Sequence, residues 1–566
     1  MNTTSSLPSP ATRRLVGARP EKRGRTTRRR LPLLCALLGG VLAGCSNPSK
    51  EAEACSKLKD LKLEHSRIVA ADYSSEGHQI SLQTAIIGIP WFIVPESCRV
   101  KLVIVPTPDS HIETEVWLPA TNWNGRLWSA GNGGLAGSID ELSMTLALSH
   151  GFATSGTDTG HSASDRDGRW ALRHGEKLID FGYRAIHETA VQAKALIQAF
   201  YGRPARFSYF ASGSNGGREA LAEAQRYPED YEGIEAGAPA FDGSNNVLVG
   251  GWLQGQLFKT ETSWIPPAKL PAIAAAAMKS CDAIDGLKDG LIDDPRRCLF
   301  QPETLLCKAG DADNCLTAPQ VGALEALYRG PGGRDLRDFG YYGYEPGGEL
   351  NWGDWLLGAA PRKSVLYGYA QEFNRYLVYG DPSWTLARFD FAGDRVEIDR
   401  RLSPIYDARD PDLSRFAARG GKLVLFHGWA DMALQPRLTI DYYQHVQAQM
   451  GADAAGKSAI LYMVPGMAHV FAGNGPNAFG QISAPPASAS PSNNIGSALV
   501  AWVEKGIRPG SIVAGKYDND FAALLEPEGM TPVRTRPLCP YPQVARWNGH
   551  GSSGDAKNFN CVPPPP

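Results

Sequence analysis

Residues 207–225 place the strongest constraint on how this chain can fold. An alternating apolar run, FSYFAS, ends in small residues, and a helix-forming run follows at residues 218–225. A strand, a tight turn and a helix with a serine at the apex form a nucleophile elbow. Ser214 is the candidate nucleophile, within the pattern Ser212-x-Ser214-x-Gly216, where serine replaces the first glycine of the usual motif. Clusters of Gly and Ser after strands also form plain turns, so the elbow needs support from the rest of the chain.

The first 44 residues predict an export signal. Three arginines at 28–30 precede an apolar stretch at 31–42, which is too short to span a membrane as a stable helix. The letters LAGC at 42–45 resemble a bacterial lipobox, in which Cys45 becomes the lipidated first residue; the alternative is a plain secretory signal. We therefore predict a lipoprotein-type signal peptide at 1–44 and a secreted protein, lipid-anchored to the bacterial cell envelope.

The charge of the remaining chain argues against nucleic-acid binding. The first 44 residues hold nine Lys or Arg and one acid, so the formal net charge beyond them is −10. A chain this acidic lacks the basic footprint of nucleic-acid-binding proteins. We expect no nucleic-acid partner, and membrane contact only through the lipid anchor.

The cysteines predict disulfides. Cys35 lies in the signal and Cys45 at the lipidation site, which leaves an even number in sequence-local pairs. The simplest connectivity is local: Cys55 with Cys98, Cys281 with Cys298, Cys307 with Cys315, and Cys539 with Cys561. None of these cysteines has C-x-x-C spacing, so zinc is not expected.

Strand-like and helix-like patterns alternate in two parts of the chain. Apolar runs at 85–94, 99–106 and 152–159 predict strands, and helical spacing at 181–201 predicts a helix before the elbow. Such alternation indicates a parallel sheet covered on both faces. Residues 242–412 are instead rich in Gly, Pro, Trp and Tyr, and indicate an inserted domain. We predict a first body segment at 45–241, a lid domain at 242–412 and a second body segment at 413–566.

Two further strands end in residues that a serine nucleophile needs. The apolar run from 422 leads to Asp431, the run from 459 leads to His469, and a helix is expected at 495–505. Histidine must accept the serine proton, and the carboxylate must orient the imidazole and stabilise imidazolium. The chain order Ser214, Asp431, His469 is that of the α/β-hydrolases, and function at strand ends is expected of an open α/β sheet. Singly, Asp431 could cap a turn and His469 could be a surface histidine.

A glycine-rich loop and an acidic loop are candidate binding elements. GNGGLAG at 131–137 lacks the lysine and spacing of phosphate-binding loops, so it is either a flexible turn or an oxyanion loop. In the acidic loop, Asp282, Asp285 and Asp289 share a segment that has glycine turns at Gly286 and Gly290 and flanking cysteines. These carboxylates suit Ca²⁺, with the carbonyls of Leu287 and Leu291 completing the shell; the alternative is a solvated acidic turn. We predict a structural calcium ion in the lid.

Longer motifs resemble the tannase and feruloyl esterase family, which includes mono(2-hydroxyethyl) terephthalate hydrolases. They are DFGYRAIHE at 180–188, EAQRYP at 223–228, GAPA at 237–240, the acidic loop at 282–291, HGWAD at 427–431, PGMAH at 465–469 and LCPYP at 538–542. The resemblance implies an α/β-hydrolase with a large calcium-bearing lid between the serine strand and the acid strand. It also implies Ser214 as nucleophile, His469 as base and Asp431 as orienting acid. The implied oxyanion donors are the backbone N–H groups of Asn215 and Gly133.

The chain departs from that family beside the serine and the histidine. The family usually has cysteines just before the serine and just after the histidine, joined in a disulfide. Those positions here are Gly213 and Val470. Losing such a bridge should cost roughly 2–5 kcal/mol unless the site is repacked.

These observations predict a secreted serine carboxylesterase that cleaves small esters of aromatic acids, of feruloyl, galloyl or terephthaloyl type, through an acyl-enzyme. The alternative from another class is a surface lipoprotein that keeps the esterase fold as a non-catalytic binding module, which the missing disulfide would favour. An amidase or a lipase is a further alternative.

Overall fold

The fold is described from a computed structural model, which places residues 49–75, 78–80, 92–335, 337–525 and 529–564. The predicted signal peptide at 1–44, the predicted lipidation site at Cys45 and most of the expected strand at 85–94 lie outside the described residues. Among the helices that are described, none is both long and apolar enough to cross a bilayer.

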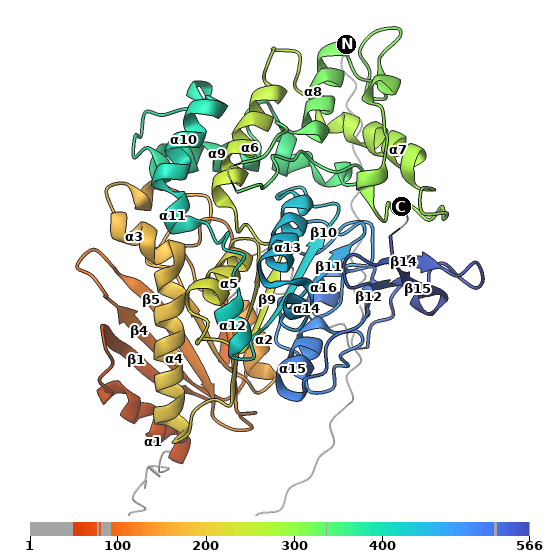
Figure 1. Ribbon diagram of the computed structural model, residues 1–566. Coiled ribbons are helices and arrows are strands. Elements are labelled where there is room, and N and C mark those ends of the chain that lie inside the picture. Colours follow the sequence, from red (N-terminus) through yellow and green to blue (C-terminus); the bar gives the residue numbers. More distant parts are fainter. Residues whose placement is uncertain (1–48, 76–77, 81–91, 336, 526–528, 565–566) are drawn as a thin grey trace, which may run out of the picture. The chain divides into compact units, whose positions relative to one another are not determined.

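A nine-stranded sheet forms the centre of the protein (Figure 1). In spatial order its strands are β1 (Ser66–Ser74), β4 (Ser97–Ile104), β5 (Ile112–Pro119), β7 (Ala153–Thr157), β6 (Arg126–Ala130), β8 (Phe207–Gly213), β9 (Gly233–Gly237), β10 (Lys422–Gly428) and β11 (Ala459–Val464). Strands β1, β4, β5 and β7 pair antiparallel, and the strands from β7 to β11 are all parallel. The predicted parallel sheet is therefore confirmed, with an antiparallel extension at one edge.

Helices cover both faces of the sheet because its central strands are apolar on both sides. Phe210 of β8 packs among residues of α4 (Ala185–Tyr201), α5 (Asn215–Arg226) and α13 (Pro436–Met450). Its neighbours Tyr209 and Ala211 pack on the opposite face, among residues of α2 (Glu141–Ser149) and α15 (Ile495–Lys505). This alternation follows from the two-residue period of a strand.

The remaining helices and ribbons of the body are short. The helices are α1 (Lys50–Lys57), α3 (Gly175–Ile179), α12 (Ser414–Ala418), α14 (Ala452–Gly456) and α16 (Asp520–Leu525). The two-stranded ribbons are β2 (His78–Ile80) with β3 (Phe92–Val94), β12 (Ile512–Lys516) with β13 (Arg534–Leu538), and β14 (Val544–Trp547) with β15 (Phe559–Val562). They complete the body around the sheet.

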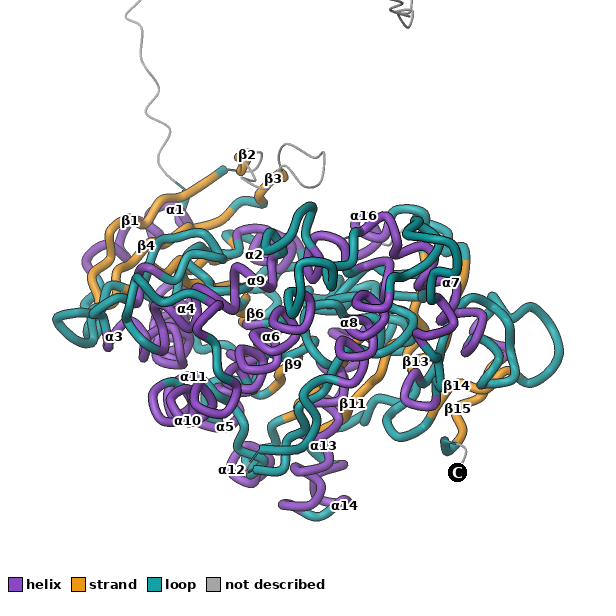
Figure 2. Tube along the Cα trace, turned by 90° about the horizontal axis from the view of Figure 1, so that it is seen from above, coloured by secondary structure: helices purple, strands orange, loops and turns teal. Residues whose placement is uncertain are grey.

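The described residues between β9 and β10 add helices and loops but no strand of the central sheet. The helices are α6 (Gly243–Leu257), α7 (Leu270–Cys281), α8 (Ala318–Arg329), α9 (Val365–Glu372), α10 (Phe391–Arg401) and α11 (Ser403–Tyr406). They share a large apolar core that includes Leu253, Leu324 and Trp352. Figures 1 and 2 show α6, α8 and α9 gathered above the sheet, so this segment has the place expected of a lid. The boundaries at 242 and 412 stay predictions.

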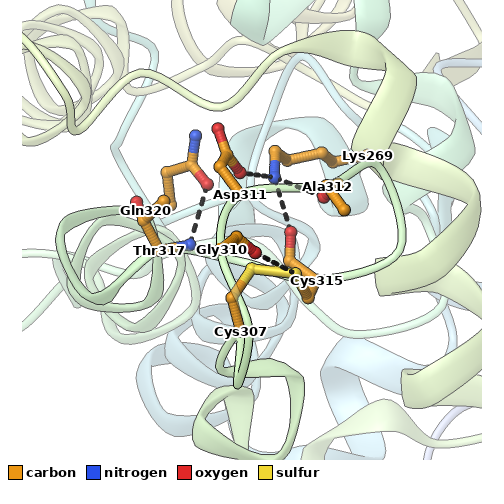
Figure 3. Close-up of a disulfide and its surroundings, with 8 residues drawn as sticks. All are labelled: Lys269, Cys307, Gly310, Asp311, Ala312, Cys315, Thr317 and Gln320. Atoms are coloured by element: carbon orange, nitrogen blue, oxygen red, sulfur yellow. Dashed lines mark hydrogen bonds and ion pairs between the residues drawn. A yellow bond between two sulfur atoms is a disulfide. The ribbon is translucent and has the colours of Figure 1, made fainter.

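All four predicted disulfides are formed, with the predicted local pairing. Two of them, Cys281–Cys298 and Cys307–Cys315, lie in the inserted segment. Figure 3 shows the buried ammonium of Lys269 beside the second one, where it donates to Asp311 Oδ1 at 2.5 Å, Ala312 O at 2.7 Å and Cys315 O at 2.6 Å. A buried cation with three acceptors fixes this disulfide loop against the start of α7.

Candidate active site

Ser214 lies at a sharp turn between β8 and α5, as the elbow pattern predicts. Its backbone angles are φ 61° and ψ −124°, a region that non-glycine residues rarely adopt and that costs about 1–3 kcal/mol. Backbone hydrogen bonds hold it there: its N–H donates to Gly237 O at 2.9 Å, and its carbonyl accepts from Ala240 at 2.9 Å and Arg218 at 3.1 Å. The strained residue is thereby fixed at the edge of a cavity that its side chain lines.

The small residues around Ser214 are required by close packing. A Cβ on Gly216 would lie 2.0 Å from Ser212 Oγ, and one on Gly217 would lie 2.8 Å from Gly237 O. Neither contact can be relieved without moving the turn. The serine at position 212 is therefore tolerated because Gly216 leaves room for its hydroxyl.

Asp431 and His469 meet at the ends of the adjacent strands β10 and β11. His469 Nδ1 lies 2.8 Å from Asp431 Oδ2, and the other carboxylate oxygen accepts the N–H groups of Ala433 at 2.7 Å and Leu434 at 3.0 Å. Burial alone would raise the pKa of Asp431, but the charge and hydrogen bonds of His469 and His427 hold that pKa well below its usual range. Asp431 is thus an ionised, fully buried acceptor for the imidazole, whose Nε2 is left for the cavity that His469 lines.

Gly213 and Val470 are in direct contact, where the resembling family carries a disulfide. A Cβ on Gly213 would lie 2.5 Å from Val470 Cγ1. Val470 adopts φ 57° and is buried in the core beneath the site, together with Met467 and Phe479. Side-chain packing therefore fills the space between the serine turn and the histidine turn.

The predicted oxyanion donors lie on two elements that flank Ser214. Asn215 begins α5, so its N–H has no acceptor within the helix. Gly133 lines the same cavity, and a Cβ there would meet no atom within 4 Å. The N–H of the preceding Asn132 is already donated to Glu219 Oε2 at 3.0 Å. This bond excludes Asn132 as an oxyanion donor, and the assignment of Gly133 stays a prediction.

Glu219 joins these two elements and was not anticipated from the sequence. One carboxylate oxygen accepts from Asn132 N–H, and the other accepts from Asn215 Nδ2 at 2.9 Å. Burial raises the pKa of Glu219 to about 7, against the opposing charge of Arg218. A single buried side chain therefore sets the distance between the glycine loop and the elbow.

The cavity has a volume of about 370 Å³ and is mostly apolar where the inserted segment lines it. The aromatic residues of this wall are Trp355, Tyr369, Phe373 and Tyr406. The Trp355 ring lies 6.2 Å from the His469 ring, and Tyr406 donates to Asn215 Oδ1 at 3.0 Å. An aromatic-rich insertion was expected from composition, but which rings reach the site depends on how α9 and α11 pack.

The acidic loop has donors that suit a hard cation, but its side chains are not gathered around one point. Asp282 Oδ1 accepts the N–H groups of Asp289 and Gly290, and Asp289 pairs with Arg536. Among the described residues, no group of three or more His, Cys, Asp or Glu side chains is arranged to hold a metal. One observation suits a cation ligand: the buried Asp289 Oδ1 has no hydrogen-bond partner. A calcium ion here stays a prediction.

Comparison with known proteins places the chain among esterases. Residues 98–562 match the family described as tannase and feruloyl esterase. An uncharacterized esterase of Xanthomonas campestris pv. campestris is 39% identical, over 94% of each chain. A probable feruloyl esterase B-2 of Aspergillus terreus is 33% identical, over 82% of this chain and 86% of that one.

Solved structures of esterases have the same fold as this chain. Feruloyl esterase B from Aspergillus oryzae superposes with a TM-score of 0.81 at 29% identity, covering 90% of this chain and all of that one. Tannin acyl hydrolase from Aspergillus niger gives a TM-score of 0.70 at 22% identity, over 91% of this chain and 96% of that one, which supports the fold alone. The α/β-hydrolase fold predicted from the sequence is confirmed.

Proposed function

The chain belongs to the tannase and feruloyl esterase family, so it is a carboxylic ester hydrolase, and we propose that it cleaves esters of phenolic acids by a serine mechanism. The observation that carries this proposal is the strained Ser214 elbow, which opens into the same cavity as the histidine of a His469–Asp431 pair. A non-catalytic binding module would not need to hold a serine in that conformation.

The proposed reaction uses the residues in the following roles. Ser214 Oγ attacks the ester carbonyl while His469 Nε2 takes the hydroxyl proton, and Asp431 stabilises the resulting imidazolium. The N–H groups of Asn215 and Gly133 stabilise the oxyanion of the tetrahedral intermediate. His469 then gives its proton to the leaving alcohol, and a water molecule releases the acid by the same steps in reverse.

The aromatic wall supports an aromatic acyl group. Rings of the inserted segment line the same cavity as Ser214, and this cavity is large enough for one phenolic acid. Apolar burial stabilises an aromatic group more than an acetyl group. Whether the acid is feruloyl, galloyl or terephthaloyl is a matter for measurement.

A panel of methyl esters tests the proposal. Ferulate, gallate and terephthalate methyl esters should be hydrolysed with higher kcat/KM than methyl acetate, and Ser214→Ala should lower turnover by about four orders of magnitude or more. The control is Ser208→Ala, in the same strand. Wild-type rates in the Ser214→Ala variant would contradict the serine mechanism.

Calcium in the inserted segment is a separate proposal. Asp282, Asp285 and Asp289 would hold it, with the carbonyls of Leu287 and Leu291, and it would cross-link the loop that follows α7. The unpaired Asp289 Oδ1 supports this proposal. Metal analysis of protein purified without chelator should find one calcium per chain, and its absence would count against the site.

Secretion with a lipid anchor at Cys45 is also proposed, from the signal-like segment and the LAGC letters. Metabolic labelling with an alkyne fatty acid in a bacterial host should mark the wild-type chain and leave Cys45→Ser unmarked. Equal labelling of both chains would contradict the anchor.

A further inference from the structure

Two imidazoles share one oxygen of Asp431. His469 Nδ1 lies 2.8 Å from Asp431 Oδ2, and His427 Nε2 lies 3.0 Å from the same atom. The ordinary triad needs only the first of these contacts. His427 is buried, with 1% of its surface exposed, and it does not line the cavity, so it cannot touch a substrate.

The second histidine is held in a defined orientation. It is the second-last residue of β10, four residues before Asp431, and its Nδ1 is 2.8 Å from Thr439 Oγ1 of α13. An ionised carboxylate only accepts, so His427 Nε2 must carry a proton and donate it. In the neutral imidazole the Thr439 hydroxyl then donates to Nδ1, which fixes that tautomer.

We propose that His427 is a positioning residue for the reaction inferred above, on which this proposal rests. It restricts rotation of the Asp431 carboxylate about the Cβ–Cγ bond, because both oxygens then have donors. Two imidazoles donate to Oδ2, and two backbone N–H groups donate to Oδ1. His427 also disperses charge from the oxygen that faces His469. With His427 removed, the whole charge of that oxygen would act on His469 and favour its imidazolium form.

Other titratable groups lie around this cluster. Asp140 and Asp165 line the cavity together with His469, and Glu219 lies behind the glycine loop. Tyr344, from the inserted segment, is buried, and burial followed by the charge of Asp431 raises the pKa of its phenol above the usual range. Tyr344 therefore stays neutral throughout the pH range of a kinetic profile. The surrounding carboxyl groups are the same in wild type and in the His427 variants, so a difference between their profiles reports the histidine–aspartate cluster.

The test compares pH profiles of kcat/KM for His427→Phe and His427→Gln with wild type. Phenylalanine keeps the ring volume but removes the donor, so kcat should fall about 10- to 100-fold with little change in KM. The acid limb should move to higher pH by about 0.5–1 unit, because the undispersed carboxylate favours imidazolium. Glutamine keeps an N–H donor, so His427→Gln should show kcat and an acid limb close to those of wild type.

The matched control is another histidine–aspartate pair, in which the aspartate is buried and the histidine is partly exposed. His187 Nδ1 lies 2.6 Å from Asp230 Oδ2 on the body, away from the cavity lining, and His187→Phe should leave the acid limb in place. If His427→Phe does not fold, Thr439→Val takes its place, with a smaller shift in the same direction.

Two results would overturn the proposal: a fall in kcat with an unmoved acid limb, or wild-type kinetics in His427→Phe. Failure of the proposed function looks different, because wild-type protein would then show no turnover that depends on Ser214. A merely structural role for His427 would lower the melting temperature and the amount of active enzyme without changing the shape of the pH profile.

Discussion

The floor and the wall of the cavity are built by different means. The floor consists of the turns that follow β8 and β11, which carry Ser214 and His469. Backbone hydrogen bonds hold Ser214, and the buried Asp431 after β10 holds His469. The wall is made of rings such as Tyr369 and Phe373, brought to the site by the packing of the inserted helices. Under the proposed function, the floor carries the cleavage of the ester and the wall selects the acyl group. Substitutions in the two regions should separate these effects.

The largest effect is expected in the floor, from Asp431→Asn. The amide can present only one acceptor oxygen, whereas the carboxylate accepts from two backbone N–H groups and two imidazoles. We expect kcat to fall by about 10³- to 10⁴-fold for all esters alike, measured under saturating substrate. Asp453→Asn, in exposed α14, is the control. A loss confined to aromatic esters would break the division between floor and wall.

Glu219→Gln should have the next largest effect. In glutamine one of the two acceptor oxygens becomes an NH₂ group, which cannot accept a hydrogen bond. Either Asn132 or Asn215 therefore loses its hydrogen bond to residue 219. Since removing an oxyanion donor outright costs about 10²- to 10³-fold, we expect a loss in kcat of about 100-fold, with KM nearly unchanged. Binding of an aromatic boronic acid, which mimics the tetrahedral state, should weaken in parallel. Unchanged boronate affinity would show that Glu219 does not act on the oxyanion site.

Substitutions in the wall should lower the hydrolysis of aromatic esters more than that of acetyl esters. For Tyr369→Ala and Phe373→Ala we expect kcat/KM for methyl ferulate to fall about 10-fold, because apolar contact with the acyl ring is lost. Hydrolysis of p-nitrophenyl acetate should change by no more than about twofold to threefold. Tyr367→Ala, on the same helix but outside the cavity lining, is the control. Equal losses for both substrates would mean that these rings support the floor.

The smallest effect concerns stability and its pH dependence. Glu235 of β9 is fully buried and accepts the N–H of Ile482, a cavity residue, at 2.6 Å. Burial raises the pKa of Glu235 to about 8, above that of the unfolded chain. The stabilisation it contributes is complete below the unfolded pKa and is lost as the pH rises towards 8.

Glu235→Gln removes this dependence, because the amide does not ionise. Relative to wild type, the variant should gain roughly 1–3 kcal/mol in unfolding free energy between pH 5 and pH 8. Urea unfolding of both proteins at pH 5 and pH 8 measures the change. The difference between wild type and variant at pH 5 serves as the reference. A constant difference between the two proteins would show that Glu235 is ionised in the folded state.

The same contrast explains how far the sequence could predict the structure. The elbow at Ser214, the strands before Asp431 and His469, and the helix Ile495–Lys505 follow from local periodicity and turn residues, and all four lie where they were expected. The helix expected at 181–201 is present: α4 covers Ala185–Tyr201, and a π-helical turn at Asp180–Arg184 leads directly into it.

The contacts that sequence reasoning missed join residues far apart in the chain. Glu219 reaches Asn132 across 87 residues, and Tyr406 reaches Asn215 across 191. The sequence places His427 in the HGWAD motif, but its contact with Asp431 depends on the turn between them, which the motif alone does not define. No local period encodes such pairs, because the packing of separate elements creates them.

The most direct test of the central claim is the site of covalent labelling. Wild-type protein treated with an aryl fluorophosphonate should gain one adduct by intact mass, and peptide mapping should place it on Ser214. The adduct should be absent in Ser214→Ala and should form much more slowly in His469→Asn. A label on another residue, or ester hydrolysis that survives in the unlabelled Ser214→Ala variant, would contradict the account.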